Sequence, residues 1–216
     1  MIKFQSFFLA LLLSSIALIS CGQKNNKSES NIVMESTNEN LEVITLGAGC
    51  FWCIEAIFEQ LNGVVSVKSG YMGGSVKNPA YKEVCNGTTG HAEVAQITFD
   101  PMIVSVDEVL EVFWKTHDPT TLNRQGNDVG TQYRSAVFYH NDNQRARATF
   151  FKEQLNVNKA YPNPVVTEIT EKSVFYEAED YHQNYFEQNG EQSYCKFVIQ
   201  PKVEKFQKAF KDKVKP

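Results

Sequence analysis

A strand pattern changes directly into a helical pattern at the first pair of cysteines in this sequence. Leu41 to Leu46 alternates and is rich in apolar residues, which is typical of a β-strand. Gly47-Ala48-Gly49 ends that strand, and apolar residues then recur at helical spacing from Phe51 to Leu61. Gly63 is a stop signal for this helix. Cys50 is therefore expected where a strand leads, through glycines, into the first turn of a helix.

Strand and helix patterns follow one another through the rest of the chain. Ser105-Val106-Asp107-Glu108 is a capping box, and it predicts a helix that ends near His117. The other predicted strands are 64–68, 93–99, 133–139 and 165–169, and the other predicted helices are 144–155, 178–188 and 203–214. A long polar loop is predicted at 120–130. These elements predict an α+β fold: a single compact two-layer α/β sandwich, with a mixed sheet flanked by helices and a ferredoxin-like core.

The first twenty residues have the pattern of an export signal. Lys3 is the only charge before an apolar run from Phe7 to Ile19, which is short for a membrane span but suits a signal peptide. The run ends in Leu18-Ile19-Ser20-Cys21-Gly22, which resembles the lipobox of bacterial lipoproteins. That resemblance implies cleavage before Cys21, lipid attachment to Cys21, and an exported protein anchored to a membrane on the periplasmic side of the cell envelope. A plain secretory signal is the alternative.

Composition divides the chain into three predicted parts. Residues 22–40 are polar and carry too few apolar residues to offset the entropy of ordering. We predict a lipoprotein signal peptide at 1–20, lipidated Cys21 with a flexible tether at 21–40, and one folded domain at 41–216. The 216 residues have a net charge of −4, which gives no basic surface for nucleic acid. No coiled-coil seam indicates assembly, so a monomer is expected.

Cys50 and Cys53 form a C-x-x-C pair on the first turn of the predicted helix. Free backbone N–H groups and the positive helix end would stabilise a thiolate at Cys50 and lower its pKa. Cys53 could then capture the oxidised product, so the pair indicates redox chemistry. A zinc site is disfavoured because the sequence has no second C-x-x-C and no paired histidines. A structural disulfide and a general thioredoxin-like oxidoreductase stay open.

Five motifs, in order along the chain, resemble those of the A-type peptide methionine sulfoxide reductases. They are Gly49-Cys50-Phe51-Trp52, residues 69–74 with 78–85, residues 87–94, residues 127–135 and residues 178–183. The matches cover nearly the whole predicted domain. The resemblance implies thiol-dependent reduction of methionine sulfoxide, free or in proteins, with a preference for the S epimer at sulfur. It implies no metal or nucleotide cofactor, and regeneration by an external thioredoxin-like dithiol reductant.

The resemblance also implies which residues carry the chemistry. Cys50 is the nucleophile that attacks the sulfoxide sulfur, and it is left as a sulfenic acid when methionine departs. Glu93 matches the general acid of the family. A carboxyl buried on an apolar strand can stay protonated near neutral pH, which this role requires. As an alternative, Glu93 is an ordinary charge on an edge strand. His91, His117, His140 and His182 do not form a metal-binding pattern, and we interpret them as structural or solvated.

Five further residues match the substrate-binding part of the family's site. Tyr81 and Tyr133 match the phenols that hold the sulfoxide oxygen, and Asp128 matches a polar neighbour of the site. Phe51 and Trp52 match the walls of a pocket for the methyl group of the substrate. Half-buried tyrosines, a turn aspartate and helix-core aromatics are the structural alternatives.

Two cysteines could resolve the sulfenic acid of Cys50. Many family members carry Gly where this chain has Cys53, and many place a resolving cysteine near the C-terminus, where this chain has Cys195. We favour Cys53 because it closes a short loop, although two thiols on a regular helix do not face each other, so local unwinding is expected. Cys195 is the rival, since the entropy of loop closure grows slowly with length. A relay through both stays open, and Cys85 is expected to be a buried or loop thiol.

The resemblance therefore predicts reduction of methionine sulfoxide, and two alternatives remain. One is an exported lipoprotein thiol–disulfide oxidoreductase, which would reduce disulfides without turning over a sulfoxide. The other is a non-catalytic lipoprotein that binds oxidised methionine peptides and produces no methionine.

Overall fold

The computed structural model describes residues 40–216. The predicted signal peptide, the lipidation site at Cys21 and nearly all of the predicted tether therefore lie outside the described residues. Within 40–216, no helix is both long and apolar enough to cross a membrane.

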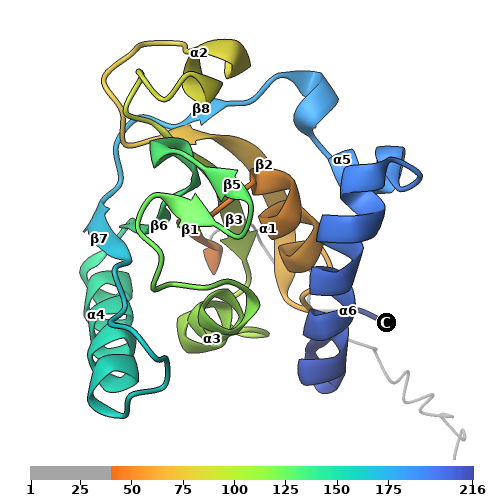
Figure 1. Ribbon diagram of the computed structural model, residues 1–216. Helices are drawn as coiled ribbons and strands as arrows, with labels where there is room; N and C mark the ends of the chain where they lie inside the picture. Colours follow the sequence, from red (N-terminus) through yellow and green to blue (C-terminus); the bar gives the residue numbers. More distant parts are fainter. Residues whose placement is uncertain (1–39) are drawn as a thin grey trace, which may run out of the picture. The chain divides into compact units, whose positions relative to one another are not determined.

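A six-stranded sheet forms the centre of the described domain (Figure 1). Its strands, in chain order, are β1 (Glu42–Ala48), β2 (Val64–Met72), β3 (Ala92–Phe99), β6 (Ser135–Tyr139), β7 (Glu168–Glu171) and β8 (Tyr176–Glu177). In space they run β7-β6-β1-β3-β2-β8. Only the β6–β7 pair is parallel, so the sheet is mixed. Two short strands, β4 (Arg124–Gln125) and β5 (Asp128–Val129), form a separate hairpin.

Helices and short helical turns connect these strands. The α-helices are α1 (Phe51–Phe58), α2 (Tyr81–Cys85), α3 (Val106–Thr116), α4 (Asp142–Val157), α5 (Tyr185–Asn189) and α6 (Gln200–Ala209). The 3-10 turns are η2 (Thr131–Tyr133), η3 (Asp180–His182) and η5 (Lys211–Lys213), and η4 (Cys195–Ile199) is a π-helical turn that runs directly into α6.

The order of elements confirms the predicted fold class. The chain passes through β1-α1-β2-β3-α3-β6, and the four strands lie side by side as β6-β1-β3-β2 with antiparallel pairing. This is the arrangement of a ferredoxin-like core. The strands β7 and β8 extend the sheet at its two edges.

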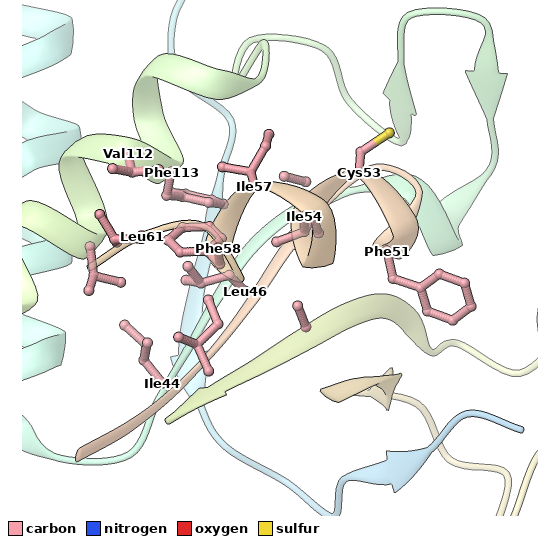
Figure 2. Close-up of a cluster of buried hydrophobic side chains, with 14 of the residues drawn as sticks. Ile44, Leu46, Phe51, Cys53, Ile54, Ile57, Phe58, Leu61, Val112 and Phe113 are labelled. Carbon is pink, nitrogen blue, oxygen red and sulfur yellow. The ribbon is translucent and has the colours of Figure 1, made fainter. Parts of the chain in front are cut away.

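The core lies between the sheet and the helices α1 and α3. Ile44 and Leu46 alternate onto the same face of β1 and pack beneath Ile54 and Phe58 of α1, with Phe113 of α3 beside them (Figure 2). All five side chains are buried. The apolar face of β1, predicted from its alternation, therefore packs against the apolar face of α1, predicted from its helical spacing. Helix α1 is fixed on the sheet by this packing, and its N-terminus carries the two cysteines.

The predicted capping box is confirmed. The Oγ atom of Ser105 accepts a hydrogen bond from the backbone N–H of Glu108 at 3.3 Å, and Oε2 of Glu108 accepts from the backbone N–H of Ser105 at 2.9 Å. Ser105 is the N-cap of α3, which ends at Thr116, directly before His117. The two residues satisfy each other's free donors at this helix end.

The predicted helix at 178–188 is wrong. Residues 180–182 form a 3-10 turn, and Asn184 adopts a left-handed conformation with φ +52°, so the short helix α5 starts only at Tyr185. The cause is the buried carboxylate of Glu55 in α1. Its Oε1 accepts from the N–H of Asn184 at 3.0 Å, and its Oε2 accepts from the N–H of Tyr185 at 3.2 Å. A tertiary contact therefore determines where this helix begins.

Several boundaries also differ from the predicted ones. The predicted loop at 120–130 contains the β4–β5 hairpin, and Tyr133 belongs to the turn η2 and not to a strand. The strand predicted at 165–169 is found at 168–171, where it pairs with β6. The last helix starts at Gln200 and ends at Ala209, because the π-helical turn precedes it and Phe210 leaves the helical conformation.

Candidate active site

Cys50 lies at the junction that the sequence predicted. It is the N-cap of α1, with the extended values φ −58° and ψ 126°, and it is buried. Gly49 precedes it with φ +90°, and a Cβ atom there would lie 2.6 Å from Cβ of Gln125. Only glycine fits this position without strain. The tight turn places Cys50 between the sheet and the β4–β5 hairpin that carries Gln125.

Cys53 lies close to Cys50 without any unwinding of the helix, so the predicted local unwinding is wrong. Cys50 stands outside the helix as its N-cap, and the backbone N–H of Cys53 donates to the carbonyl oxygen of Cys50 at 3.1 Å. This geometry makes the two thiols neighbours, and each shifts the pKa of the other. The prediction assumed that both cysteines lie within a regular helix. Cys50 has an extended backbone and lies before the first helical residue.

The two thiols differ in pKa, and Cys53 is the more acidic of the pair. Burial, together with Cys53 and the charge of Glu93, raises the pKa of Cys50 well above its ordinary value. The hydrogen bond from Cys50 lowers the pKa of Cys53 to about 7, against the effect of burial and with help from Lys202. The expected low pKa of Cys50 is therefore wrong for the resting pair. The first helical N–H, that of Phe51, donates to Glu93 and so does not serve the Cys50 sulfur.

Glu93 lies on β3 and is 1% exposed. Its Oε2 accepts the N–H of Phe51 at 3.2 Å, while its Oε1 is buried without a hydrogen-bond partner among the described residues. Burial raises the pKa of Glu93 to about 8, and the nearby charges of Asp128 and Cys53 add to this effect against the Phe51 hydrogen bond. Glu93 is thus a buried carboxyl, as predicted, and it is mainly protonated at neutral pH.

Tyr81 and Tyr133 are half-buried near Glu93. Tyr81 is the first residue of α2, and its ring stacks on Phe51 with centroids 6.3 Å apart. Burial raises the pKa of both phenols, and the charge of Glu93 contributes to both shifts. Cys85, at the end of α2, is partly exposed. Its thiol is a neighbour of the Tyr81 phenol and therefore lies beside the site. Both phenols thus stay protonated and are able to donate.

Asp128 joins the site through Tyr194, which the sequence analysis did not identify. The hydroxyl of Tyr194 donates to Oδ2 of Asp128 at 2.8 Å. Tyr194 also lowers the pKa of Cys50, against the larger effect of burial. Tyr194 therefore links the β4–β5 hairpin to Cys50.

An aromatic group surrounds the N-terminus of α1. Trp52 stacks on Tyr185 with ring centroids 3.6 Å apart, and its Nε1 donates to Nδ1 of His182 at 3.2 Å. Phe51 is fully buried and packs against the His182 ring at 5.1 Å. His182 is a structural residue, as predicted, but its place is in this site. Trp52 stays partly exposed, so one aromatic face of the group meets solvent.

Glu179 is a second residue that the sequence analysis missed. Its Oε1 accepts the backbone N–H of Tyr81 at 2.9 Å, and its Oε2 accepts the hydroxyl of Tyr71 at 2.9 Å. It thereby fixes the start of α2 and the direction of Tyr81. Glu179 and His182 both belong to the motif at 178–183, which was the available signal for their positions.

Cys195 is fully buried as the first residue of the π-helical turn. Burial raises its pKa, and the charge of Cys53 adds to the shift. Helix α1, which carries Cys53, contacts the π-helical turn that begins at Cys195. The four cysteines of the described residues are all free. Among residues 40–216, no group of three or more His, Cys, Asp or Glu side chains is arranged to hold a metal ion.

Two interacting thiols at a helix N-terminus, beside a neutral carboxyl that can give up a proton, are the working parts of a thiol-dependent oxidoreductase. The comparisons with known proteins identify which one. The family model described as peptide methionine sulfoxide reductase matches residues 42–214. The chain belongs to this family, and its reaction is the reduction of methionine sulfoxide.

Named relatives are similar over most of the chain. The peptide methionine sulfoxide reductase MsrA of Saccharolobus solfataricus is 57% identical over 175 residues, which is 81% of this chain and 98% of that protein. That of Polynucleobacter asymbioticus is 50% identical over 186 residues, 86% of this chain and 98% of that protein. The solved structure of methionine sulfoxide reductase A of Corynebacterium diphtheriae has a TM-score of 0.67 at 38% identity, covering 70% of this chain and 76% of that one. These matches disfavour both alternative functions.

Proposed function

We propose that Cys50 is the nucleophile in this reduction and that Glu93 supplies the proton to the sulfoxide oxygen. The observation that carries the proposal is the state of Glu93: one carboxyl oxygen is held by the N–H of Phe51, and the other is buried, without a partner among the described residues. A protonated carboxyl fixed in this way can donate to a substrate atom beside Cys50. The substrate is methionine sulfoxide, free or in peptides and proteins, with the S configuration at sulfur.

The first half-reaction transfers one oxygen atom. As the Cys50 sulfur attacks the sulfoxide sulfur and bonds to it, its proton passes to the neighbouring Cys53 thiolate. Glu93 gives its proton to the oxygen, and the resulting hydroxyl moves from the substrate sulfur to the Cys50 sulfur while the bond between the two sulfur atoms breaks. The products are methionine, the sulfenic acid of Cys50, and the carboxylate of Glu93.

The phenols and aromatic rings hold the substrate in this reaction. The hydroxyls of Tyr81 and Tyr133 donate to the sulfoxide oxygen, and their high pKa values keep the donor protons in place. Asp128 orients the hydroxyl of Tyr194 beside Cys50. Phe51 and Trp52 provide the apolar surface for the methyl group on sulfur.

The second half-reaction closes a disulfide. Cys53 attacks the Cys50 sulfur, the S–S bond forms, and the oxygen leaves as water. The contact between the two thiols supports Cys53 as the first resolving cysteine. Cys195, as the neighbour of Cys53, then attacks that disulfide and passes the oxidation outward. A thioredoxin-like dithiol reduces the final disulfide.

The test is conversion of a methionine sulfoxide peptide by the reduced full chain, with dithiothreitol and then with thioredoxin as reductant. We expect Cys50→Ser to form no methionine in either assay. Cys53→Ser should keep the first half-reaction and lose most of its turnover with thioredoxin. Cys85→Ser, which removes a thiol outside the relay, is the matched control and should keep turning over.

The outcomes separate the proposed roles. Methionine formation by Cys50→Ser would contradict Cys50 as the nucleophile. Full thioredoxin-driven turnover by Cys53→Ser, together with loss of turnover in Cys195→Ser, would make Cys195 the first resolving cysteine.

We also propose that the chain is an exported lipoprotein, anchored to a membrane of the cell envelope through Cys21. The support is the sequence pattern at residues 1–22 alone. An electron source outside the cytoplasm would then be needed. Cell fractionation of the full chain and of Cys21→Ala tests this: the unaltered chain should be found with membranes, and Cys21→Ala should not. Membrane association that is unaffected by Cys21→Ala would contradict the lipid anchor.

A further inference from the structure

A small cavity lies behind the helix that carries the two cysteines. Its volume is about 10 Å³, and its lining brings together Cys53 of α1, His117 at the end of α3, and Lys202 of α6. Figure 2 shows the sulfur of Cys53 pointing away from the aliphatic side chains of the core cluster. Cys53 and Lys202 both line this space between three helices, and Lys202 helps to lower the pKa of Cys53.

Lys202 has no carboxylate to neutralise it in the described part of the chain. It lies in the first turn of α6, is only partly exposed, and forms no ion pair with any acidic side chain of residues 40–216. A lysine that faces a buried space without a carboxylate partner carries a desolvation cost unless another anion balances it. The Cys53 thiolate is the anion that this cavity can offer.

His117, the other basic side chain of the cavity, is neutral. Its Nδ1 lies 2.6 Å from the carbonyl oxygen of Phe113, and its Nε2 lies 2.8 Å from Oγ of Ser135. Burial lowers the pKa of His117 to about 4, and the positive charge of Lys202 contributes. Among the described residues that line the cavity, Lys202 is thus the only cation at neutral pH.

We propose that Lys202 is a positioning residue that holds Cys53 as a thiolate, ready to attack the oxidised Cys50. This role rests on the proposed function of Cys53 as the resolving cysteine. Lys202 comes from α6 and lines the cavity of Cys53, which neither Glu93 nor the phenols of Tyr81 and Tyr133 line, so it acts through Cys53 and does not touch the substrate. It deepens the proposed reaction by separating the group that serves Cys53 from those that serve Cys50.

Six groups, Lys202 among them, face Cys53 and affect its charge. They are Cys50 at the N-cap of α1, Glu93 of β3, Asp128 of β5, Cys195 of η4, His117 after α3, and Lys202 of α6. Asp128 opposes the thiolate. Glu93 is mainly protonated at neutral pH and His117 is neutral, so Lys202 is the group that offsets Asp128.

The step that Lys202 serves is balanced without any further reactant. Before it, Cys53 carries the proton taken from Cys50, and Glu93 is a carboxylate. Cys53 gives this proton to Glu93 and becomes the thiolate that Lys202 stabilises. Its sulfur attacks the Cys50 sulfur, the S–S bond forms, and the S–O bond breaks. Glu93 protonates the leaving hydroxide, which departs as water. In this step the Cys53 sulfur is oxidised and the sulfenic sulfur of Cys50 is reduced, both to the level of the disulfide.

The first test is a pH titration of thiolate absorbance in the reduced full chain, which requires no turnover. The unaltered chain should show an inflection near pH 7 that is missing in Cys53→Ser. In Lys202→Met the inflection should move upward by about one pH unit, because removal of a close opposite charge shifts a titration by this order. Lys202→Arg should restore it, and Lys208→Met, on the same helix but exposed, should leave it unchanged.

The second test follows a single turnover without external reductant. After mixing with methionine sulfoxide, Lys202→Met should form as much methionine as the unaltered chain does, but should lose its thiols about tenfold more slowly at neutral pH. The pH profile of thiol loss should shift with the titration.

An unchanged inflection in Lys202→Met, or unchanged thiol loss at neutral pH, overturns the role of Lys202. Equal slowing of both steps with an unchanged pH profile also overturns it, because that result indicates a structural defect. The titration is independent of catalysis. An unaltered chain that forms no methionine therefore counts against the proposed function and not against the charge that Lys202 places beside Cys53.

Discussion

The backbone N–H of Phe51 donates a 3.2 Å hydrogen bond to Oε2 of Glu93, which joins the first turn of α1 to the middle of the sheet. The bond orients a neutral carboxyl at the nucleophile and also uses the helix donor that would otherwise stabilise a Cys50 thiolate. This one hydrogen bond thus orients the proton donor and withholds from Cys50 a backbone donor that would lower its pKa.

The pH dependence of methionine formation should follow Glu93. Because its pKa is raised to about 8, the acid form is lost as the pH rises through that value, and the single-turnover rate should fall there. Glu93→Gln should be slower by about 10²–10⁴-fold and should lack this alkaline limb, since general acid catalysis contributes that order. Rapid-quench measurement of methionine on both sides of pH 8 checks this. An alkaline limb that persists in Glu93→Gln would assign it to another group.

Glu93 should also make the fold less stable at high pH. Its folded-state pKa lies near 8 and its ordinary value is 4.5, so the folded chain binds more protons than the unfolded chain between these values. The contribution is fully present below about pH 4.5 and is lost as the pH rises toward 8. Denaturant unfolding of Glu93→Gln should show a weaker decline of stability across this window than the unaltered chain. Parallel curves for the two chains would count against the raised pKa.

Removal of the Tyr194 hydroxyl should slow the attack by Cys50. Tyr194→Phe keeps the ring against Trp52 but loses the hydrogen bond to Asp128 and the hydroxyl beside Cys50. We expect about a tenfold fall in the rate of methionine formation, since one hydrogen bond to a charged group contributes about 1.5–3 kcal/mol at most. Tyr139→Phe, on β6, is the matched control and should react normally. Equal rates in both variants would exclude this role of Tyr194.

Gly49 should tolerate no side chain. Gly49→Ala adds a Cβ atom at 2.6 Å from Cβ of Gln125 and forces alanine to a φ of +90°, so we expect a loss of about 2–4 kcal/mol in unfolding free energy. Gly126→Ala is a matched control: its φ is +61°, but no atom lies within 4 Å of an added Cβ. It should cost about 1 kcal/mol, from the backbone alone. Equal melting temperatures for the two variants would show that the contact with Gln125 is relaxed at little cost.

Local patterns predicted the elements that local interactions stabilise. The alternation in β1, the helical spacing after Phe51 and the capping box at Ser105 all correspond to contacts within a few residues in the chain or to simple burial. The family motifs also led to Cys50, Glu93, Tyr81, Tyr133 and Asp128, and the structure brings these residues near one another.

The errors arise where a distant residue decides the local structure. Glu55 is 129 positions from Asn184, yet its carboxylate sets the start of α5 at Tyr185, inside the helix predicted at 178–188. Nothing in that segment shows this capping. The prediction of a low pKa for Cys50 failed because burial and the charge of Glu93, which lies on β3, raise it. The lowered pKa of Cys53 depends in part on Lys202 of α6. Neither partner is visible in the sequence around the cysteines.

The π-helical turn at Cys195–Ile199 has a consequence for the angular phase of the C-terminal helix. A π turn contains one residue more than an α turn, so every later side chain is rotated by about 100° relative to an uninterrupted α-helix. Tyr194, before the turn, is directed to Asp128, whereas Lys202, after it, lines the cavity of Cys53. The extra residue rotates the later side chains, so that Tyr194 and Lys202 of one continuous helix approach Cys50 and Cys53 from different sides. Deletion of a single residue within 195–199 would restore the regular period and turn Lys202 out of register with Cys53.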